Sequence, residues 1–257
     1  MTDPLSPLDV TIEGAVAVLT MTRSARRNAM DQALVDAMKA TLLRLDRDDA
    51  VAAIVLNGCA PGFCAGSDLK FISALDTEAM CRFEQECGDL GRLIGHISKP
   101  VVAAVETFAI GGGFTLAACC DVVVAGRGSS WSMPEVPHGW LTPWGLGPLV
   151  ARVGPVRARN LCFCLKPLTG EEAAAIALVD ICCADGEALA TAREIAAQLA
   201  RLPAPAVAAT KRFFSSHFTG SGEALDFEAN RLFRDNCREA AAQATFGKFR
   251  NRAGARP

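Results

Sequence analysis

The sequence lacks the excess positive charge of nucleic-acid-binding proteins. It also lacks the long apolar segments of membrane-spanning proteins. Its 26 Lys and Arg residues nearly balance 28 Asp and Glu residues, which leaves a formal net charge of -2. Such a chain lacks the excess positive charge that attracts nucleic acid or an anionic membrane surface. Its apolar runs are also too short to span a bilayer. We therefore expect a soluble, cytoplasmic protein with no nucleic-acid or membrane partner.

Secretory and metal-binding patterns are also scarce. The first ten residues, "MTDPLSPLDV", have neither the basic nor the apolar region of a signal peptide. The chain has three histidines, and no two of its eleven cysteines have the two-residue gap of a zinc ribbon. We therefore expect no metal site, and we expect the cysteines to be small core residues in a reducing compartment.

Alternating strand and helix patterns fill the first two thirds of the chain. Short strands are predicted at 10–14 and 15–21, and buried apolar strands at 51–58, 100–106, 121–126 and 177–183. Helices are predicted from Asp31 as an N-cap and at about 76–97, 113–120 and 155–165. After about residue 185 only helical patterns remain. We predict an α/β core over 1–195 and a C-terminal helical region over 196–257.

Two glycine-rich corners follow buried strands. They are "NGCAPGFCAGSDLKF" (57–71) and "ETFAIGGGFTLAACC" (106–120), and each ends where a helix should begin. Helix N-termini expose unpaired N–H groups, and glycine lets a ligand approach them. Two such corners facing each other could aim two N–H donors at one oxygen, as an oxyanion hole. Tight packing of helix on strand also requires glycine, so this pattern alone leaves both interpretations open.

The motifs "FCAGSDL", "KPVVAAV", "AIGGGFTLAACCDVVVAG" and "PEVPHGW" resemble the crotonase, or enoyl-CoA hydratase/isomerase, superfamily in order and spacing. Weaker matches extend the resemblance over roughly residues 8–250. The resemblance implies a crotonase-like spiral of ββα repeats with a C-terminal helical region. It also implies an enzyme that stabilises the enolate of an acyl-CoA thioester, and a homotrimer or dimer of trimers. Coenzyme A would enter as part of the substrate, with no further cofactor.

The resemblance also assigns catalytic positions. The two enolate-stabilising N–H groups fall on Ser67 and Gly112. Hydratases of the family use two glutamates, and here the first position is Thr115 and the second is Glu135. One carboxylate can take a proton from one carbon and return it two carbons away, whereas hydration needs two groups. We therefore expect an isomerase that shifts a double bond by means of Glu135.

Several alternatives stay open at this stage. A hydratase could use Thr115 or Glu106 to hold water, and His138 could assist a base. A thioester hydrolase, a decarboxylase or a non-catalytic acyl-CoA binder could share the scaffold. The tryptophans at 131, 140 and 144 could line an acyl pocket or pack beneath the loop that contains Glu135.

The resemblance places the coenzyme A end near the first corner, where backbone carbonyls between Ala65 and Leu69 would read the adenine. Arg26, Arg27 and Lys248 are candidates for the phosphates. The full set of predicted substrate-binding residues is Arg26, Arg27, Ala65, Gly66, Asp68, Leu69, Gly111, Pro134, His138, Trp140 and Lys248.

Overall fold

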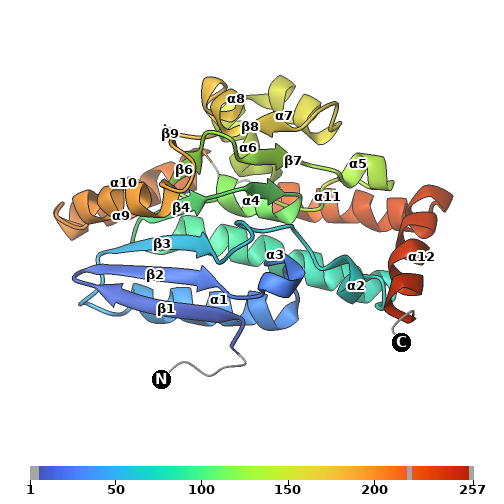
Figure 1. Cartoon of the computed structure of the whole chain (residues 1–257), viewed down its shortest axis with the longest axis horizontal. Coiled ribbons are helices and arrows are strands. Elements are labelled where there is room, and N and C mark those ends of the chain that lie inside the picture. Colours follow the sequence, from blue (N-terminus) through green and yellow to red (C-terminus); the bar gives the residue numbers. More distant parts are fainter. Residues whose placement is uncertain (1–5, 219–221, 255–257) are drawn as a thin grey trace.

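A six-stranded sheet runs through the computed structural model, which describes residues 6–218 and 222–254 (Figure 1). Its order is β1 (Leu8–Glu13), β2 (Val16–Met21), β3 (Ala53–Gly58), β4 (Val101–Val105), β6 (Val122–Gly126) and β9 (Ile181–Cys183). β1 pairs antiparallel with β2, and the other neighbours are parallel. The predicted strands therefore form one mixed, mostly parallel sheet.

Helices cover both faces of this sheet, which explains why its central strands are continuous apolar runs. One face packs on α9 (Ala188–Leu199), whose Ala188, Ala192 and Ala196 are fully buried. The opposite face contributes to the main core with α1 (Gln32–Asp46) and α3 (Thr77–His96). Asp31 and Asp76 cap these two helices by accepting a hydrogen bond from a backbone N–H. The predicted Asp31 cap is confirmed.

A second, three-stranded sheet lies beside the first, and the sequence patterns did not predict it. It contains β5 (Phe108–Ile110), β7 (Ser130–Ser132) and β8 (Leu168–Thr169). Short helices connect the strands: η1 (Ser24–Arg26), α2 (Leu69–Ile72), α4 (Gly112–Ala118), α5 (Glu135–His138), α6 (Leu146–Val153), α7 (Pro155–Cys162) and α8 (Gly170–Ala175). β5 follows β4 after two residues and leads into α4. The second glycine corner, between β5 and α4, therefore lies close to the first.

The strand predicted at 177–183 is wrong over its first half. Ala177 has a positive φ of 61°, and the Leu178 N–H bonds to the Ala173 carbonyl. These features end α8, which a Thr169–Glu172 capping box begins. The apolar run at 177–179 therefore packs as the end of a helix, and β9 is only three residues long.

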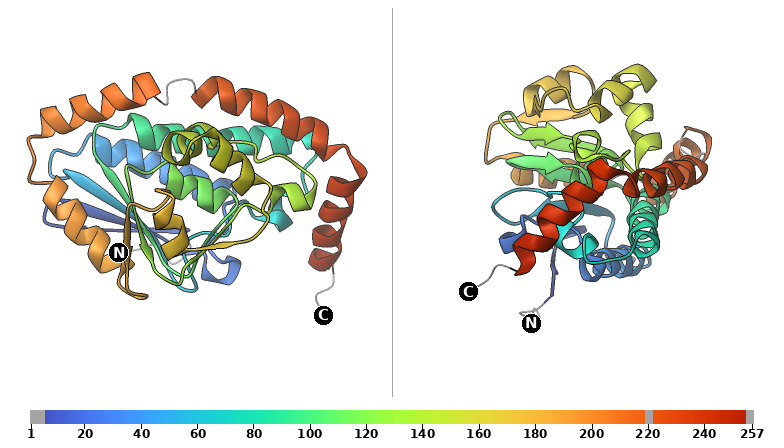
Figure 2. Two further views of the ribbon diagram at one scale, coloured as in Figure 1. Left: turned by 90° about the horizontal axis from the view of Figure 1, so that it is seen from above. Right: turned by 90° about the vertical axis from the view of Figure 1, so that its right-hand side faces the viewer.

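The C-terminal helices wrap around the α/β core (Figure 2). α10 (Ala204–Phe218) and α11 (Gly222–Cys237) pack along α3, and α12 (Ala240–Gly254) turns across the end of the molecule against α2 and α5. The expected boundary at 195/196 falls inside α9, which covers the main sheet. Among residues 6–218 and 222–254, no helix is long and apolar enough to cross a membrane.

Cysteine side chains lie mainly inside the fold. Cys64, Cys87 and Cys237 are fully buried, as expected for small core residues, while Cys59 and Cys164 are partly exposed. The described part of the chain holds no group of three or more His, Cys, Asp or Glu side chains placed to bind a metal ion.

Candidate active site

The first glycine corner presents the backbone N–H of Ser67. The Met30 N–H donates to the Gly66 carbonyl, and the Asp68 N–H donates to the Met30 carbonyl, each at 2.7 Å. These two bonds hold the chain on both sides of Ser67, whose own N–H has no acceptor among the described residues. The Asp68 side chain caps α2 and pairs with Arg23, which fixes the corner further. Ser67 therefore offers a preorganised, unpaired donor.

The second corner has three consecutive glycines, and each has a different role in the geometry. Gly111 adopts a φ of 55°, and a Cβ there would stand 2.8 Å from Glu135 Oε1. A Cβ on Gly113 would meet the Cys64 carbonyl oxygen at 2.2 Å. Gly112 begins α4, so its N–H has no acceptor within the helix, and none lies elsewhere in the described chain.

The two corners meet in one cavity of about 410 Å³. A Cβ on Gly66 would lie 2.9 Å from the Gly112 nitrogen, so the backbones before Ser67 and at Gly112 are in direct contact. Both Ser67 and Gly112 line the cavity. Two unpaired N–H donors in a shared cavity can stabilise an oxygen that gains negative charge during a reaction.

Glu135 supplies a buried carboxylate to the same cavity. It begins the one-turn helix α5, is 7% exposed, and its Oε2 has no hydrogen-bond partner in the described structure. Burial, with a further contribution from the charge of Glu84, raises the pKa of Glu135 to about 7. A carboxylate with a pKa near neutral pH is suited to accepting and returning protons.

Glu84 is a second cavity carboxylate, which the sequence analysis missed. It lies in the middle of α3 and is 3% exposed. Its Oε1 accepts from Ser67 Oγ at 2.7 Å, and its Oε2 accepts from Trp144 Nε1 at 3.0 Å. Burial raises the pKa of Glu84 to about 7 as well. The one available signal was a glutamate on the otherwise apolar face of a predicted amphipathic helix.

Thr115 does not face the cavity. It is fully buried, it is absent from the cavity lining, and its hydroxyl donates to the Gly112 carbonyl at 3.1 Å. A Cβ on Gly145 would stand only 2.7 Å from the Cβ of Thr115, so the backbone at Gly145 closes over the side chain. This geometry gives a catalytic water no access to Thr115, which corrects the expectation that it could hold one.

Glu106 also lies away from the cavity. Its Oε1 accepts from the Ala188 N–H at 2.7 Å, at the first residue of α9, and it does not line the cavity. A carboxylate at a helix N-terminus pairs an otherwise orphaned donor and interacts favourably with the helix dipole. The alternative that Glu106 holds water for a hydratase is therefore wrong, because its carboxylate caps α9.

The three tryptophans divide between packing and the cavity. Trp131 is buried beneath the site, against Phe114, and its Nε1 donates to Ser129 Oγ at 3.0 Å. Trp140 and Trp144 line the cavity. His138 lines it too, and burial, assisted by the charge of Lys248, lowers the pKa of its imidazole.

Most of the predicted substrate-binding residues meet at this cavity. Its lining includes Arg26, Arg27, Ala65, Gly66, Asp68, Leu69, Gly111, Pro134, His138 and Trp140. Lys248 is not among the lining residues, although its charge reaches His138. The Arg27 guanidinium lies over the Phe108 ring at 4.3 Å from its centroid. Cationic side chains therefore stand beside the first corner.

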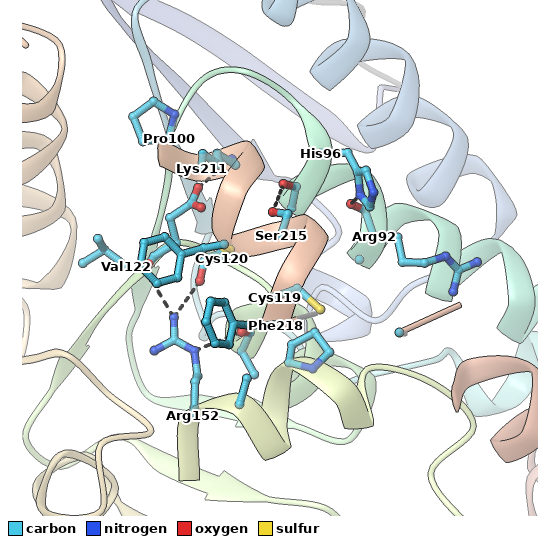
Figure 3. A pocket seen from close by; sticks show the side chains of 18 of the residues that line it. Arg92, His96, Pro100, Cys119, Cys120, Val122, Arg152, Lys211, Ser215 and Phe218 are labelled. Carbon is cyan, nitrogen blue, oxygen red and sulfur yellow. Dashed lines mark hydrogen bonds and ion pairs between the residues drawn. The ribbon is translucent and has the colours of Figure 1, made fainter. Parts of the chain in front are cut away.

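A larger cavity of about 890 Å³ lies elsewhere, between α3, α6 and the C-terminal helices (Figure 3). Its charged groups are already paired: Lys211 binds Asp121 and the Lys99 carbonyl, and Arg152 binds the Cys120 carbonyl and Asp180. It contains neither the unpaired N–H donors nor the two carboxylates of the smaller cavity, so we assign the chemistry to the smaller one.

Comparisons with known proteins show what the whole chain is similar to. The family model described as enoyl-CoA hydratase/isomerase matches residues 11–253. The short-chain-enoyl-CoA hydratase of Clostridium acetobutylicum is 33% identical over 187 residues, covering 72% of this chain and 71% of the relative. The 2,3-dehydroadipyl-CoA hydratase of Escherichia coli is 30% identical over 209 residues, covering 81% of each. The structure of OdaA from Pseudomonas aeruginosa superposes with a TM-score of 0.85 at 26% identity, covering 95% and 98% of the two chains.

Proposed function

The chain belongs to the enoyl-CoA hydratase/isomerase family, and from that premise we propose that it shifts the double bond of a 3-enoyl-CoA to the 2 position. The observation that carries this proposal is Glu135, a cavity carboxylate with one oxygen unpaired, combined with the buried, cavity-excluded Thr115 at the other hydratase position. One mobile proton is what a double-bond shift requires.

In the proposed reaction, the thioester carbonyl oxygen lies between the N–H groups of Ser67 and Gly112. The ionised Glu135 takes a proton from C2, and the C–H electron pair moves into the conjugated system to form a dienolate. Its negative charge rests on the thioester oxygen, where the two donors stabilise it. A proton then returns at C4 as the electrons move back, which leaves the double bond between C2 and C3.

Coenzyme A would lie over the first corner. Arg26 and Arg27 line this end of the cavity and provide charge for the phosphates, while the backbone from Ala65 to Leu69 offers hydrogen-bonding groups for the adenine. The proposed reaction uses no cofactor other than the coenzyme A of the substrate. The acyl group would extend past the tryptophans at 140 and 144.

Hydration of a 2-enoyl-CoA is a second candidate. The relatives named above are hydratases, and a second cavity carboxylate, Glu84, could activate water while Glu135 handles the proton at C2. Thr115 and Glu106 do not contribute to this candidate, because neither lines the cavity.

Separate incubations with a 3-enoyl-CoA, a trans-2-enoyl-CoA and a β-ketoacyl-CoA distinguish these candidates by mass spectrometry and absorbance of the products. We expect the 3-enoyl-CoA to be converted to the 2-enoyl isomer at the highest kcat/KM. Faster addition of water to the 2-enoyl-CoA would favour the hydratase. Release of free coenzyme A or of CO₂ would indicate a hydrolase or decarboxylase, and binding without any product would indicate a non-catalytic binder.

Glu135→Gln tests the role of Glu135 directly. Glutamine keeps the shape of the side chain but cannot accept a proton at neutral pH. We expect deuterium exchange at C2 of bound butyryl-CoA in D₂O to fall by the ~10²–10⁴-fold typical of a lost general base, with nearly unchanged CoA binding. A variant that exchanges at the wild-type rate would exclude Glu135 as the base.

A further inference from the structure

Glu84 is held firmly in the cavity wall by two donors from different elements. Ser67 Oγ and Trp144 Nε1 each bond to one of its oxygens. Room for the Trp144 side chain comes from glycines on the same face of α3, because a Cβ on Gly88 would stand 3.2 Å from Trp144 Cβ and one on Gly91 would stand 3.3 Å from Trp144 Cζ3. The carboxylate therefore has a fixed orientation, and each oxygen keeps a further lone pair.

The position of Glu84 is tied to the pair of N–H donors. Its partner Ser67 carries one donor on its backbone, and a Cβ on Gly112, which carries the other, would stand 3.2 Å from Trp144 Cζ2. Glu135 lies next to the same donors on the Gly111 side. Two carboxylates from α3 and α5 thus stand around the place where the thioester oxygen would bind.

Stability alone does not account for Glu84. In the described residues it forms no ion pair with a Lys, Arg or His side chain, although it is almost completely buried. A buried carboxylate without a cationic partner costs free energy whenever it is ionised. Such a cost is characteristic of groups that a reaction uses.

We propose that Glu84 is the second proton-transfer residue of this site and delivers the proton to C4 of the acyl chain. The proposal rests on the proposed isomerase function. The ionised Glu135 takes the C2 proton, and the protonated Glu84 gives its own proton to C4 as the electrons of the dienolate form the new C4–H bond. Turnover leaves Glu135 protonated and Glu84 ionised, and exchange with solvent water restores the starting state.

The groups around Glu84 are compatible with a singly protonated pair. Glu135 is the other carboxylate whose charge couples to it. The neighbouring thiols of Cys81, Cys87 and Cys237 stay protonated at neutral pH, because burial raises the pKa of each one. In the proposed starting state the pair therefore holds one proton, on Glu84, while Glu135 is ionised.

Isotope transfer in the wild-type enzyme gives the first test. A 3-enoyl-CoA carrying deuterium at C2 is converted in H₂O, and the 2-enoyl product is analysed for deuterium at C4 from the earliest turnovers. With one carboxylate moving the same proton, part of the deuterium reaches C4. With two carboxylates, the proton delivered to C4 comes from Glu84, so we expect no transferred deuterium. Substantial transfer would overturn the proposal.

Variants give the second test, with exchange at C2 of butyryl-CoA and isomerisation measured side by side. We expect Glu84→Gln to lose isomerisation by at least ~10²-fold but to keep C2 exchange within a few fold, and Glu84→Asp to recover part of the isomerisation. Glu135→Gln should lose both. Glu86→Gln is the matched control, since Glu86 lies on α3 but outside the cavity, paired with Lys39, and it should lose neither.

Trp144→Phe tests the same role without changing the carboxylate. It removes one donor to Glu84, and a lost donor to an ionised carboxylate raises its pKa. The fall of kcat/KM at high pH that reflects ionisation of Glu84 should therefore move to higher pH. It should be absent in Glu84→Gln. A structural role alone predicts no such movement.

The outcomes separate this proposal from the proposed function. If the wild-type enzyme isomerises a 3-enoyl-CoA and Glu84→Gln does so at a rate within threefold of it, only the role of Glu84 is overturned. Loss of C2 exchange together with isomerisation in Glu84→Gln would also overturn it, because Glu84 would then merely hold the site together. Wild-type enzyme that exchanges at C2 without isomerising any 3-enoyl-CoA would overturn both.

Discussion

Gly112 combines the start of a helix with the wall of the cavity, so a bulky side chain there would crowd the donor N–H. A Cβ would stand 2.8 Å from Met30 Cε and would occupy space beside the donor N–H. We expect Gly112→Val to block the thioester oxygen and to lower kcat/KM. The fall should correspond to a loss of at least ~2.7–4 kcal/mol of transition-state stabilisation, the amount associated with one lost oxyanion donor. Isomerisation and C2 exchange both report this loss. Full turnover in a folded variant would exclude the oxyanion-hole assignment.

The two buried glutamates should make the free energy of unfolding depend on pH. Their pKa rises from 4.5 in a model peptide to about 7 in the folded state, so the folded protein keeps protons that the unfolded chain has released. The contribution of these two groups to stability is therefore full below pH 4.5 and falls as pH rises to 7, by about 3 kcal/mol for a shift of this size.

Urea unfolding between pH 5 and 8 measures this dependence. Glu84→Gln and Glu135→Gln should each flatten the curve and be more stable than wild type at pH 8, whereas Glu86→Gln should follow wild type. Unchanged curves for both cavity variants would mean that neither pKa is raised.

At the same scale, local motifs predicted the donors and Glu135 but not the rest of the site. The family resemblance placed Ser67 and Gly112 at donor positions, and the structure leaves both of their N–H groups unpaired within the described residues, whereas the glycine pattern alone also fitted tight packing of helix on strand. Which way Thr115 points depends on the Gly145 loop, thirty residues later. Glu84 reaches the cavity because α3 packs beside Trp144, a contact between residues sixty positions apart that one sequence does not reveal.

Among elements, Asp226 of α11 connects α3 to the loop that carries Trp144. Its carboxylate pairs with Arg92 of α3 and accepts from the Gly145 N–H at 2.9 Å. We expect Asp226→Ala to lower the free energy of unfolding by about 1–3 kcal/mol, because it leaves the buried Gly145 N–H without a partner and removes one of the two carboxylates that bind Arg92. Urea unfolding measures the loss, and Asp235→Ala, at an exposed position of α11, is the control. Equal stability of the two variants would contradict this connection.

The same variant should also affect the reaction, since Trp144 positions Glu84. We expect isomerisation to fall more than C2 exchange in Asp226→Ala, measured at a temperature where the protein stays folded. An equal fall in both rates would indicate a general loss of the site.

The elements that the sequence predicted well are the central strands of the main sheet, whose apolar pattern follows from burial on both faces. β3, β4 and β6 read as buried strands because helices cover both of their faces. β5, β7 and β8 have two or three residues each, which is too short for an alternating pattern to be recognised. They form because neighbouring elements bring them together, so their prediction required the fold itself.

At the scale of the whole molecule, large apolar side chains remain uncovered on the C-terminal helices. Phe213, Phe214 and Phe218 of α10 and Phe227 of α11 are between 53% and 65% exposed. The rings of Phe213, Phe214 and Phe218 contact one another, and such exposed aromatic clusters are typical of surfaces that associate. The family resemblance leads us to propose that copies of this chain cover them in a homotrimer or a dimer of trimers.

Light scattering during gel filtration tests this assembly. We expect a particle of three or six times the 27.0 kDa chain mass. Phe214→Glu should shift the particle towards the monomer, because burying a carboxylate in an apolar contact is costly. Leu165→Glu introduces the same charge at an 83% exposed position between α7 and β8, and it should leave the mass unchanged. A wild-type protein that runs as a monomer at micromolar concentration would exclude the trimer, and the exposed phenylalanines would then need another partner.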